Sequence, residues 1–279
     1  MPELPEVETM RRGLLPMVGG RIDDAHRTPC PRKPIAITPR IDRFRRRVVG
    51  CRIGSIGRVG KRVIVGLDSG DSIVLEPRMT GLVLLADPPT REHLRFRLAI
   101  SDAPAGELLY WDRRGLGSVR LLSAEQFADV FSRERIGPDA LEITAEQLQQ
   151  RLHTSRRAIK VALLDQRAVA GIGNLYASEI LHLAEIHPAK RCDLMRRVQW
   201  QRIHSAIGQI LHAAIAHEGS TLSDGTYRNA LNQQGGYQHY HQVYDRAGQP
   251  CPRCKSELVV RIVQAQRSTF FCRRCQTKK

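Results

Sequence analysis

The amino-acid sequence predicts an α+β protein with a β-sandwich-like N-terminal part, a helical C-terminal part and a small four-cysteine element at the end. Apolar residues alternate with polar ones over much of residues 20–122, which is typical of half-buried strands. From about 124 to 218 they recur at steps of three and four residues, which is typical of helices. The length of 279 residues allows two domains, or one large domain with an appendage.

The charge balance predicts an anionic partner. Lysine and arginine total 44 and aspartate and glutamate total 28, which gives a net charge of +16. Such a surplus is typical of proteins that bind DNA, RNA or an acidic membrane surface. No stretch is long and apolar enough to span a bilayer, and the N-terminus has no apolar signal core. We therefore expect a cytoplasmic protein that binds nucleic acid and contains no disulfides. We also expect it to act as a monomer.

The first predicted element is a helix over residues 4–17. Pro5 suits a first helical turn, and Glu6 and Glu8 favour the positive end of the helix dipole. Val7 and Met10 recur at helical spacing and are expected to face a core.

The β-rich part follows. Residues 63, 65 and 67 are apolar and alternate with other residues, residues 68–71 predict a turn, and residues 73 and 75 continue on a return strand. Residues 94–100 alternate in the same way. These strands predict a sandwich or a flattened barrel.

Five segments in the second half predict helices, with a linker near residues 136–138. They cover residues 125–131, 146–153, 158–165, 175–186 and 195–217. The polar, glycine-rich residues 219–236 predict a flexible loop. The predicted domains are therefore 1–123, 138–236 and 243–279.

Two CxxC pairs predict one structural zinc ion. Cys251 and Cys254 form the first pair, Cys272 and Cys275 form the second, and seventeen residues separate the pairs. Each pair presents two thiolates at an angle that suits a tetrahedral ion, and four thiolates leave no position open for water. Two disulfides are the alternative, which a cytoplasmic location argues against. The residues between the pairs predict a two-stranded hairpin that carries Arg267.

Three distant segments together resemble the formamidopyrimidine-DNA glycosylases. Residues 2–9 (PELPEVET) resemble the family's N-terminus, residues 171–179 (GIGNLYASE) its helix–two-turn–helix, and residues 266–275 its zinc finger. The resemblance covers essentially the whole chain in the family's order. The related endonuclease VIII group usually has glycine in place of Leu4, which favours the formamidopyrimidine branch. The C-terminal helices are therefore expected to form a helix–two-turn–helix domain.

The resemblance implies a nucleophile at the N-terminus. Removal of Met1 leaves the secondary amine of Pro2, and α-amines titrate near pH 8, so part of it is neutral at pH 7. Glu3 matches an acid–base group at the sugar, Lys61 a proton donor in β-elimination, and Arg267 the arginine of the δ-elimination step. Glu6 lies one helical turn from Glu3, and its role is open between facing the same pocket and complementing the dipole.

The resemblance also implies residues that hold DNA with the damaged nucleotide flipped out. Met79 and Leu116 match residues that fill the gap, and Arg114 matches the contact to the orphaned base. The expected remaining DNA contacts are His93, Arg156, Lys160 and Asn174. Two positions depart from the usual pattern: Leu116 replaces an aromatic wedge, and Glu76 replaces a histidine.

The resemblance implies base excision of oxidised purines, including 8-oxoguanine and formamidopyrimidines, from double-stranded DNA, followed by cleavage of the abasic site. Two alternatives stay open. One is the same chemistry on oxidised pyrimidines or abasic sites alone. The other is a zinc-finger DNA-binding protein without catalysis, in which Pro2, Glu3 and Lys61 are incidental.

Overall fold

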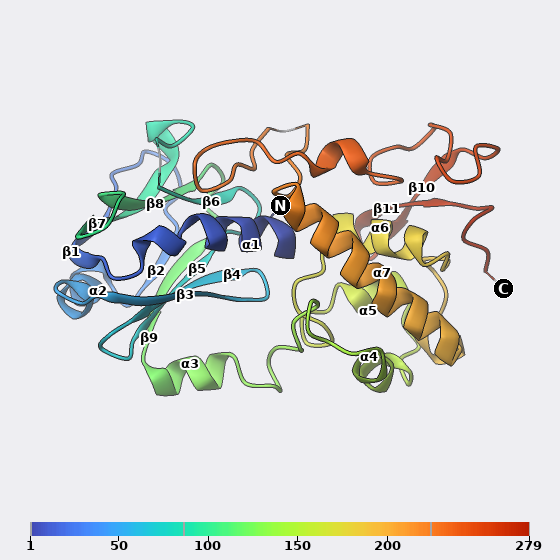
Figure 1. Ribbon diagram of the computed structural model, residues 1–279, viewed down its shortest axis with the longest axis horizontal. Helices are drawn as coiled ribbons and strands as arrows, with labels where there is room; N and C mark the ends of the chain where they lie inside the picture. Colours follow the sequence, from blue (N-terminus) through green and yellow to red (C-terminus); the bar gives the residue numbers. More distant parts are fainter. Residues whose placement is uncertain (1, 86, 224, 279) are drawn as a thin grey trace. The chain divides into compact units, whose positions relative to one another are not determined.

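The computed structural model describes residues 2–85, 87–223 and 225–278 (Figure 1). The chain divides into two compact units. The first contains the residues up to Ser132 together with Ile215–Gln238, and the second contains Arg133–Ala214 and the residues from His239 onward. The first unit is therefore discontinuous in sequence, and the predicted domain bounds stay a prediction.

The first unit is built on two β-sheets. One sheet has the strand order β1-β7-β8-β6 and the other β2-β9-β5-β4-β3. The strands are β1 Arg21–Arg27, β2 Ala36–Thr38, β3 Ile53–Val59, β4 Arg62–Leu67, β5 Ser72–Glu76, β6 Gly81–Leu84, β7 Leu94–Ser101, β8 Glu107–Asp112 and β9 Ser118–Leu122. Neighbouring strands pair antiparallel, except β2 and β9, which are parallel.

Apolar side chains from both sheets meet in one core. Val63 and Val65 of β4, and Phe96 and Leu98 of β7, are fully buried in this core. Their alternation along each strand places them on one face, as the sequence predicts. Helix α1 (Leu4–Gly13) adds Met10 to the same core and packs on β3, β4 and β6. The predicted sandwich is confirmed.

Short helices complete the first unit. They are η1 (Leu15–Met17), α2 (Ile41–Val48), η2 (Arg91–His93) and α3 (Ala124–Val130). Helix α2 lies in a region for which the sequence predicts mostly strand. Its basic residues 45–47 occupy the last turn, where cations complement the dipole, while Phe44 and Val48 are buried. Helix α1 ends four residues earlier than predicted and continues as η1.

The second unit is helical and ends in a β-hairpin. Its elements are α4 (Ala145–Leu152), α5 (Ile159–Leu163), α6 (Asn174–Leu183), η3 (Cys192–Leu194), most of α7 (Arg197–Ala216), β10 (Val259–Gln264) and β11 (Arg267–Cys272), and η4 (Tyr237–Tyr240) lies at the boundary between the units. All five predicted helices are confirmed. No helix in the described part of the chain is long and apolar enough to cross a membrane.

Candidate active site and nucleic-acid interface

The start of α1 places two predicted catalytic residues in a buried position. Pro2 is buried, and Glu3, the residue just before the helix, is only 3% exposed. The Glu6 carboxylate accepts a hydrogen bond from the Glu3 backbone N–H, with Oε2 at 2.8 Å from the nitrogen. This contact fixes the backbone at Glu3 relative to the first helical turn.

Glu6 also holds a segment more than two hundred residues away in sequence. Its Oε1 accepts a hydrogen bond from the Ser220 backbone N–H at 2.9 Å, and the side chain is 3% exposed. Gly219 lies next to this contact. Its φ is +78°, and a Cβ at this position would lie 2.8 Å from Glu6 Oε1. Glu6 therefore connects the N-terminal residues to residues 219–236.

That segment is tied down by many polar contacts, although the sequence predicts a flexible loop. The Asn229 carboxamide oxygen accepts hydrogen bonds from the backbone N–H groups of Leu231 and Gln233, at 3.0 and 2.9 Å. Its amide nitrogen donates to Glu218 Oε2 at 3.0 Å. Asn229 is 5% exposed. Asn229 therefore finds its partners within the segment and on Glu218, the residue just before it.

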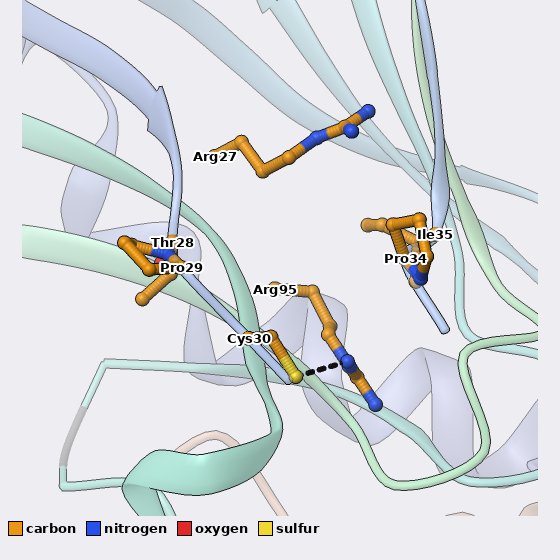
Figure 2. Close-up of a pocket in the computed structure, with 7 residues that line it drawn as sticks. All are labelled: Arg27, Thr28, Pro29, Cys30, Pro34, Ile35 and Arg95. Carbon is orange, nitrogen blue, oxygen red and sulfur yellow. Dashed lines mark hydrogen bonds between the residues drawn. The ribbon is translucent and has the colours of Figure 1, made fainter. Parts of the chain in front are cut away.

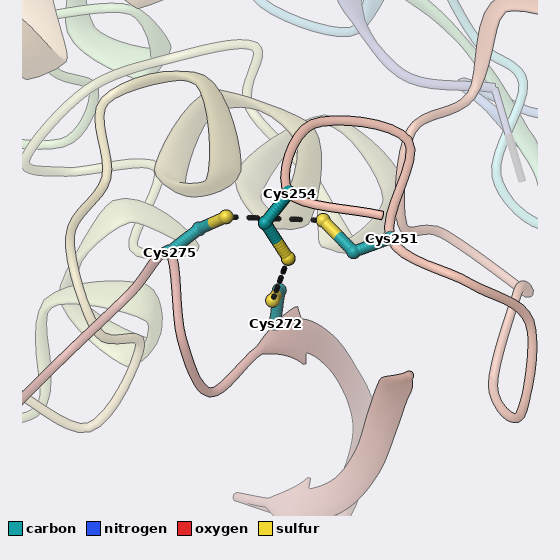
Figure 3. Close-up of side chains that lie close together, drawn as sticks. All are labelled: Cys251, Cys254, Cys272 and Cys275. Carbon is teal, nitrogen blue, oxygen red and sulfur yellow. Dashed lines mark hydrogen bonds between the residues drawn. The ribbon is translucent and has the colours of Figure 1, made fainter. Parts of the chain in front are cut away.

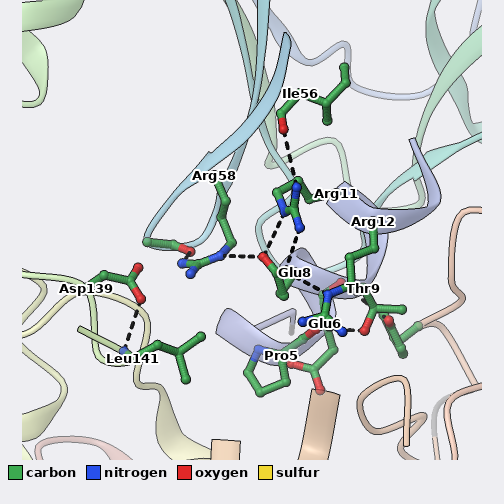
Figure 4. Close-up of polar contacts among 12 residues, drawn as sticks. Pro5, Glu6, Glu8, Thr9, Arg11, Arg12, Ile56, Arg58, Asp139 and Leu141 are labelled. Atoms are coloured by element: carbon green, nitrogen blue, oxygen red, sulfur yellow. Dashed lines mark hydrogen bonds and ion pairs between the residues drawn. The ribbon is translucent and has the colours of Figure 1, made fainter. Parts of the chain in front are cut away.

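Glu8 is the centre of a charge cluster on the N-terminal helix (Figure 4). Its carboxylate accepts hydrogen bonds from Arg11 at 2.9 Å, from Arg12 at 2.9 Å and from Arg58 at 3.1 Å. Burial alone would raise the pKa of Glu8, but the three guanidinium groups outweigh it and lower that pKa to about 2. The sequence predicts only a dipole role for this residue.

Lys61 lies in the turn between β3 and β4, two of the strands on which α1 packs, and is half-buried. It belongs to the same compact unit as Pro2 and Glu3. The next residue, Arg62, contacts Glu76, which replaces the family's usual histidine, at 3.1 Å. Arg78 lies 3.5 Å from the same carboxylate. Glu76 therefore forms ion pairs with Arg62 and Arg78 at the position where the family usually has a histidine.

The residues expected to enter the DNA stack lie on two connections of the first unit. Met79, between β5 and β6, is 37% exposed. Arg114 is exposed and Leu116 is half-buried, both between β8 and β9. His93 ends η2 and packs edge-on against Trp111, with ring centroids 5.5 Å apart. Its Nδ1 is buried without a hydrogen-bond partner among the described residues.

A pocket of about 300 Å³ lies near the connection between β8 and β9 (Figure 2). Figure 2 shows Cys30 and Arg95 on its wall, where the Arg95 guanidinium donates to Cys30 Sγ. Arg95 is 2% exposed and also donates to the Asp112 carbonyl oxygen at 2.7 Å. The pocket is therefore lined by a residue that supports the connection carrying Arg114.

In the second unit Lys160 is not a surface cation. Its Nζ donates to Asn174 Oδ1 at 2.8 Å, to the Ser268 carbonyl oxygen at 2.8 Å and to Thr269 Oγ1 at 2.7 Å, and the side chain is 1% exposed. All three ammonium donors are used within the unit. These contacts hold Asn174 against β11, and the expected DNA contact of Lys160 stays a prediction.

Two further expected DNA contacts of this unit have different settings. Asn174 is the first residue of α6 and donates from Nδ2 to the Ser268 carbonyl oxygen at 3.0 Å. Arg156 is exposed and lies in irregular chain before α5. The reason is that Ala158 is extended and pairs with Arg191 as an isolated bridge, so α5 begins only at residue 159.

Arg267 is exposed at the tip of the predicted hairpin. It is the first residue of β11 and pairs with Gln264 of β10. Ala265 and Gln266 form the two-residue turn, with φ of +45° and +60°. Two positive φ values match the twist that a tight hairpin needs. The hairpin presents Arg267 outward on a rigid ribbon.

The four predicted cysteines lie together at the base of this hairpin (Figure 3). All four sulfur atoms lie within 4.8 Å of one another. Cys251 and Cys275 are 3.8 Å apart, and Cys254 and Cys272 are 3.7 Å apart. Zn–S bonds of about 2.3 Å at tetrahedral angles require S···S distances of about 3.8 Å. The donor set therefore fits one zinc ion, and none of the seven cysteines forms a disulfide.

Helix α6 anchors the zinc element through two buried side chains. The Glu179 carboxylate accepts hydrogen bonds from the backbone N–H groups of Gln242, Val243 and Tyr244, at 2.8, 3.0 and 2.7 Å. His182 Nε2 lies 3.5 Å from Cys251 Sγ. Burial lowers the pKa of His182 to about 4. Neither residue has a motif that would reveal this role.

A β-sandwich unit, a helical unit and a four-cysteine hairpin together define a two-unit protein with a zinc-finger element. Three family models match the chain: the formamidopyrimidine-DNA glycosylase N-terminal domain at residues 1–119, its H2TH domain at residues 136–226, and a zinc finger found in FPG and IleRS at residues 248–278. The chain belongs to the formamidopyrimidine-DNA glycosylase family.

Individual relatives agree over the full length. The formamidopyrimidine-DNA glycosylase of Chloroflexus aurantiacus is 41% identical and covers 99% of this chain and 98% of its own. A Lactococcus lactis FPG mutant in complex with Fapy-dG-containing DNA has a TM-score of 0.88 at 33% identity. The wild-type Lactococcus lactis FPG with oxidised-pyrimidine-containing DNA has a TM-score of 0.86 at 33% identity. Each structure covers 99% of this chain and 100% of its own.

Proposed function

We propose that this protein excises oxidised purines, including 8-oxoguanine and formamidopyrimidines, from double-stranded DNA and then cleaves the abasic site. The observation that carries the proposal is the buried pair Pro2 and Glu3 at the start of α1. A proline in this position becomes a secondary α-amine once Met1 is removed. The family membership and the Fapy-dG complex of the Lactococcus lactis relative support this substrate class.

The proposed reaction begins with the neutral Pro2 nitrogen. It attacks C1′ of the damaged nucleotide, the bond from C1′ to the base breaks, and the base leaves. The C1′–O4′ bond then breaks, O4′ takes up a proton, and the resulting iminium ion links the Pro2 nitrogen to the opened sugar. Glu3 is the proposed acid–base group at that sugar, and its nearly complete burial favours proton transfer over solvation.

Strand cleavage follows from the iminium ion. Its positive nitrogen draws electrons from C2′, so loss of a C2′ proton expels the 3′ phosphate in β-elimination, and the 5′ phosphate then leaves in δ-elimination. Lys61 is the proposed proton donor in the first step, and Arg267 is proposed for the second. The exposure of Arg267 at the hairpin tip suits contact with a phosphate.

Borohydride trapping tests the mechanism. Processed protein is incubated with sodium borohydride and a duplex containing 8-oxoguanine, beside an undamaged duplex. We expect a covalent adduct only with the damaged duplex, and peptide mapping should locate it at Pro2. A chain that keeps an extra residue before Pro2 should lose at least 100-fold in adduct yield while it still shifts DNA in a gel. An adduct that persists in this blocked chain would disprove the role of the Pro2 amine.

A second substrate class has a specific observation in its favour. The Lactococcus lactis relative is described with oxidised-pyrimidine-containing DNA, and Glu76 and Leu116 depart here from the family pattern. Parallel excision assays on duplexes with dihydrouracil and with 8-oxoguanine separate the two classes. Faster release of dihydrouracil would replace the oxidised-purine assignment. DNA binding without any adduct would support the non-catalytic alternative.

A further inference from the structure

The two connections that carry the proposed gap-filling and orphan-base residues meet at one buried carboxylate. Residues 77–80 connect β5 to β6, and residues 113–117 connect β8 to β9. Asp112, the last residue of β8, is fully buried and pairs with Gly81, the first residue of β6. It therefore stands between the two connections.

The Asp112 carboxylate folds residues 113–117 around itself. Its Oδ2 accepts hydrogen bonds from the backbone N–H groups of Leu116 and Gly117, at 2.9 and 2.8 Å. Its Oδ1 accepts one from the Arg114 N–H at 3.1 Å. Gly115 completes the bend with a φ of +62°. A carboxylate that accepts several backbone N–H groups holds a loop in one conformation.

A hydroxyl group then joins this loop to the other connection. Thr80 Oγ1 donates to Asp112 Oδ1 at 2.5 Å and accepts from the Arg114 N–H at 3.0 Å. Thr80 is 3% exposed. The residue next to it is Met79, so one side chain connects the backbone that presents Met79 with the backbone that presents Arg114.

Arg95 also holds this loop, through the backbone carbonyl oxygens at its start. Its Nε donates to the Asp112 carbonyl oxygen at 2.7 Å, and Nη2 donates to the Arg113 carbonyl oxygen at 3.3 Å. Because Arg95 is 2% exposed, its guanidinium group is shielded from solvent while it binds these backbone oxygen atoms. The connections are thus fixed before any DNA binds, while Met79 and Arg114 keep their side chains exposed.

We propose that Asp112 and Thr80 are positioning residues that set the spacing between Met79 and the pair Arg114 and Leu116. Extrusion of a nucleotide requires the gap to be filled and the orphaned base to be held at the same time. A fixed spacing removes the ordering cost of assembling these side chains on the DNA. The inference rests on the proposed function, because it assigns these side chains to the DNA stack.

The test compares Thr80→Val with Thr80→Ser. Valine keeps the shape of threonine but lacks the hydroxyl, and serine keeps the hydroxyl. We expect Thr80→Val to lower kcat/KM on an 8-oxoguanine duplex at least tenfold and Thr80→Ser to stay within about twofold of the original protein. Borohydride trapping on a single-stranded abasic oligonucleotide should stay within about twofold for both, because no stack has to be opened there.

A spectroscopic readout needs no chemistry. A duplex with a tetrahydrofuran site and 2-aminopurine opposite it reports unstacking as a rise in fluorescence on binding. Thr80→Val should lose at least half of that rise at saturating protein. Ser123→Ala, which removes the cap of α3 in the same unit, is the control for lowered stability and should keep the full rise. Asp112→Asn is the second variant and should resemble Thr80→Val.

A double-mutant comparison shows whether Thr80 acts through the loop. Leu116→Ala should lower kcat/KM severalfold in the original protein but change it little in Thr80→Val, because the wedge is already misplaced. The inference is overturned if the Thr80→Val fluorescence rise equals that of the original protein, or if Thr80→Val loses single-stranded trapping to the same extent as duplex activity. Absence of trapping by the original protein would instead overturn the proposed function, and the fluorescence comparison would still decide the inference.

Discussion

A buried carboxylate among three arginines gives the N-terminal helix a charge contact that depends on pH. Glu8 accepts from Arg11, Arg12 and Arg58, and its pKa lies at about 2 in the folded protein against an ordinary value of 4.5. The folded state therefore binds the Glu8 proton less tightly than the unfolded state does. The resulting stabilisation is complete above pH 4.5 and is lost as the pH falls from about 4.5 to about 2.

Glu8→Gln should therefore destabilise the first unit by roughly 2–3 kcal/mol at pH 7, and by much less at pH 3. Urea unfolding at both pH values measures the difference. Trp111 lies on β8 and reports on this unit when Trp200 is replaced by phenylalanine. Glu125→Gln, an exposed position on α3, is the control. A difference that does not shrink at low pH would contradict the assignment of the effect to ionised Glu8.

Gly219→Ala should damage activity more than its size implies. The added Cβ would lie 2.8 Å from Glu6 Oε1 at a φ of +78°. Glu6 or residues 219–236 must move, which we expect to cost roughly 1–3 kcal/mol and to lower 8-oxoguanine excision at least tenfold. Gly106→Ala, where no atom lies within 4 Å of the added carbon, should keep both stability and activity. Equal activity of Gly219→Ala and Gly106→Ala would show that Glu6 does not shape the site.

At the scale of elements, one lysine links α5, α6 and β11. Lys160 donates to Asn174, Ser268 and Thr269 while almost fully buried. A buried ammonium group is stable only when its donors are all satisfied, so the three elements hold one another in register. Arg267 begins β11 next to Ser268, and its position depends on the same contacts.

Lys160→Met should therefore uncouple the hairpin from α6. The change leaves three acceptors without their donor and should cost roughly 2–4 kcal/mol of stability. With Arg267 less well placed, the proposed second elimination should slow more than the first. Gel analysis of cleaved abasic DNA should show more β-elimination product relative to δ-elimination product. Lys190→Met, a half-buried lysine of the same unit, should leave the product ratio unchanged.

The sequence predicts elements better than long-range polar contacts, for a physical reason. Alternation at residues 63, 65 and 67 and the CxxC spacing are local patterns, because strand pleat and a knuckle are set by neighbours in the chain. Two partners of Lys160, Ser268 and Thr269, lie more than one hundred residues later, and Ser220 lies more than two hundred residues after Glu6. No local pattern encodes such pairs, so the sequence does not reveal the buried contacts of Lys160, and residues 219–236 are predicted flexible.

At the scale of the molecule, zinc removal should separate DNA binding from the stability of the first unit. The four thiolates lie in the second unit, while Trp111 lies in the sandwich. Without the ion, the thiolates repel one another and the small core around Val243 and Phe270 loses its centre. Chelation should lower DNA affinity at least tenfold while Trp111 emission stays constant. Retained affinity after measured zinc loss would show that the hairpin does not hold DNA.

The first compact unit also uses two separate stretches of chain, residues up to 132 and residues 215–238. During synthesis on a ribosome the sandwich strands emerge long before Ser220, whose backbone N–H donates to Glu6. The first unit is therefore completed only after residues 215–238 emerge, although its first residues are translated first. A nascent chain carries the proline without the segment that Glu6 binds until most of the polypeptide has been made, and products truncated before Ser220 would lack that contact altogether.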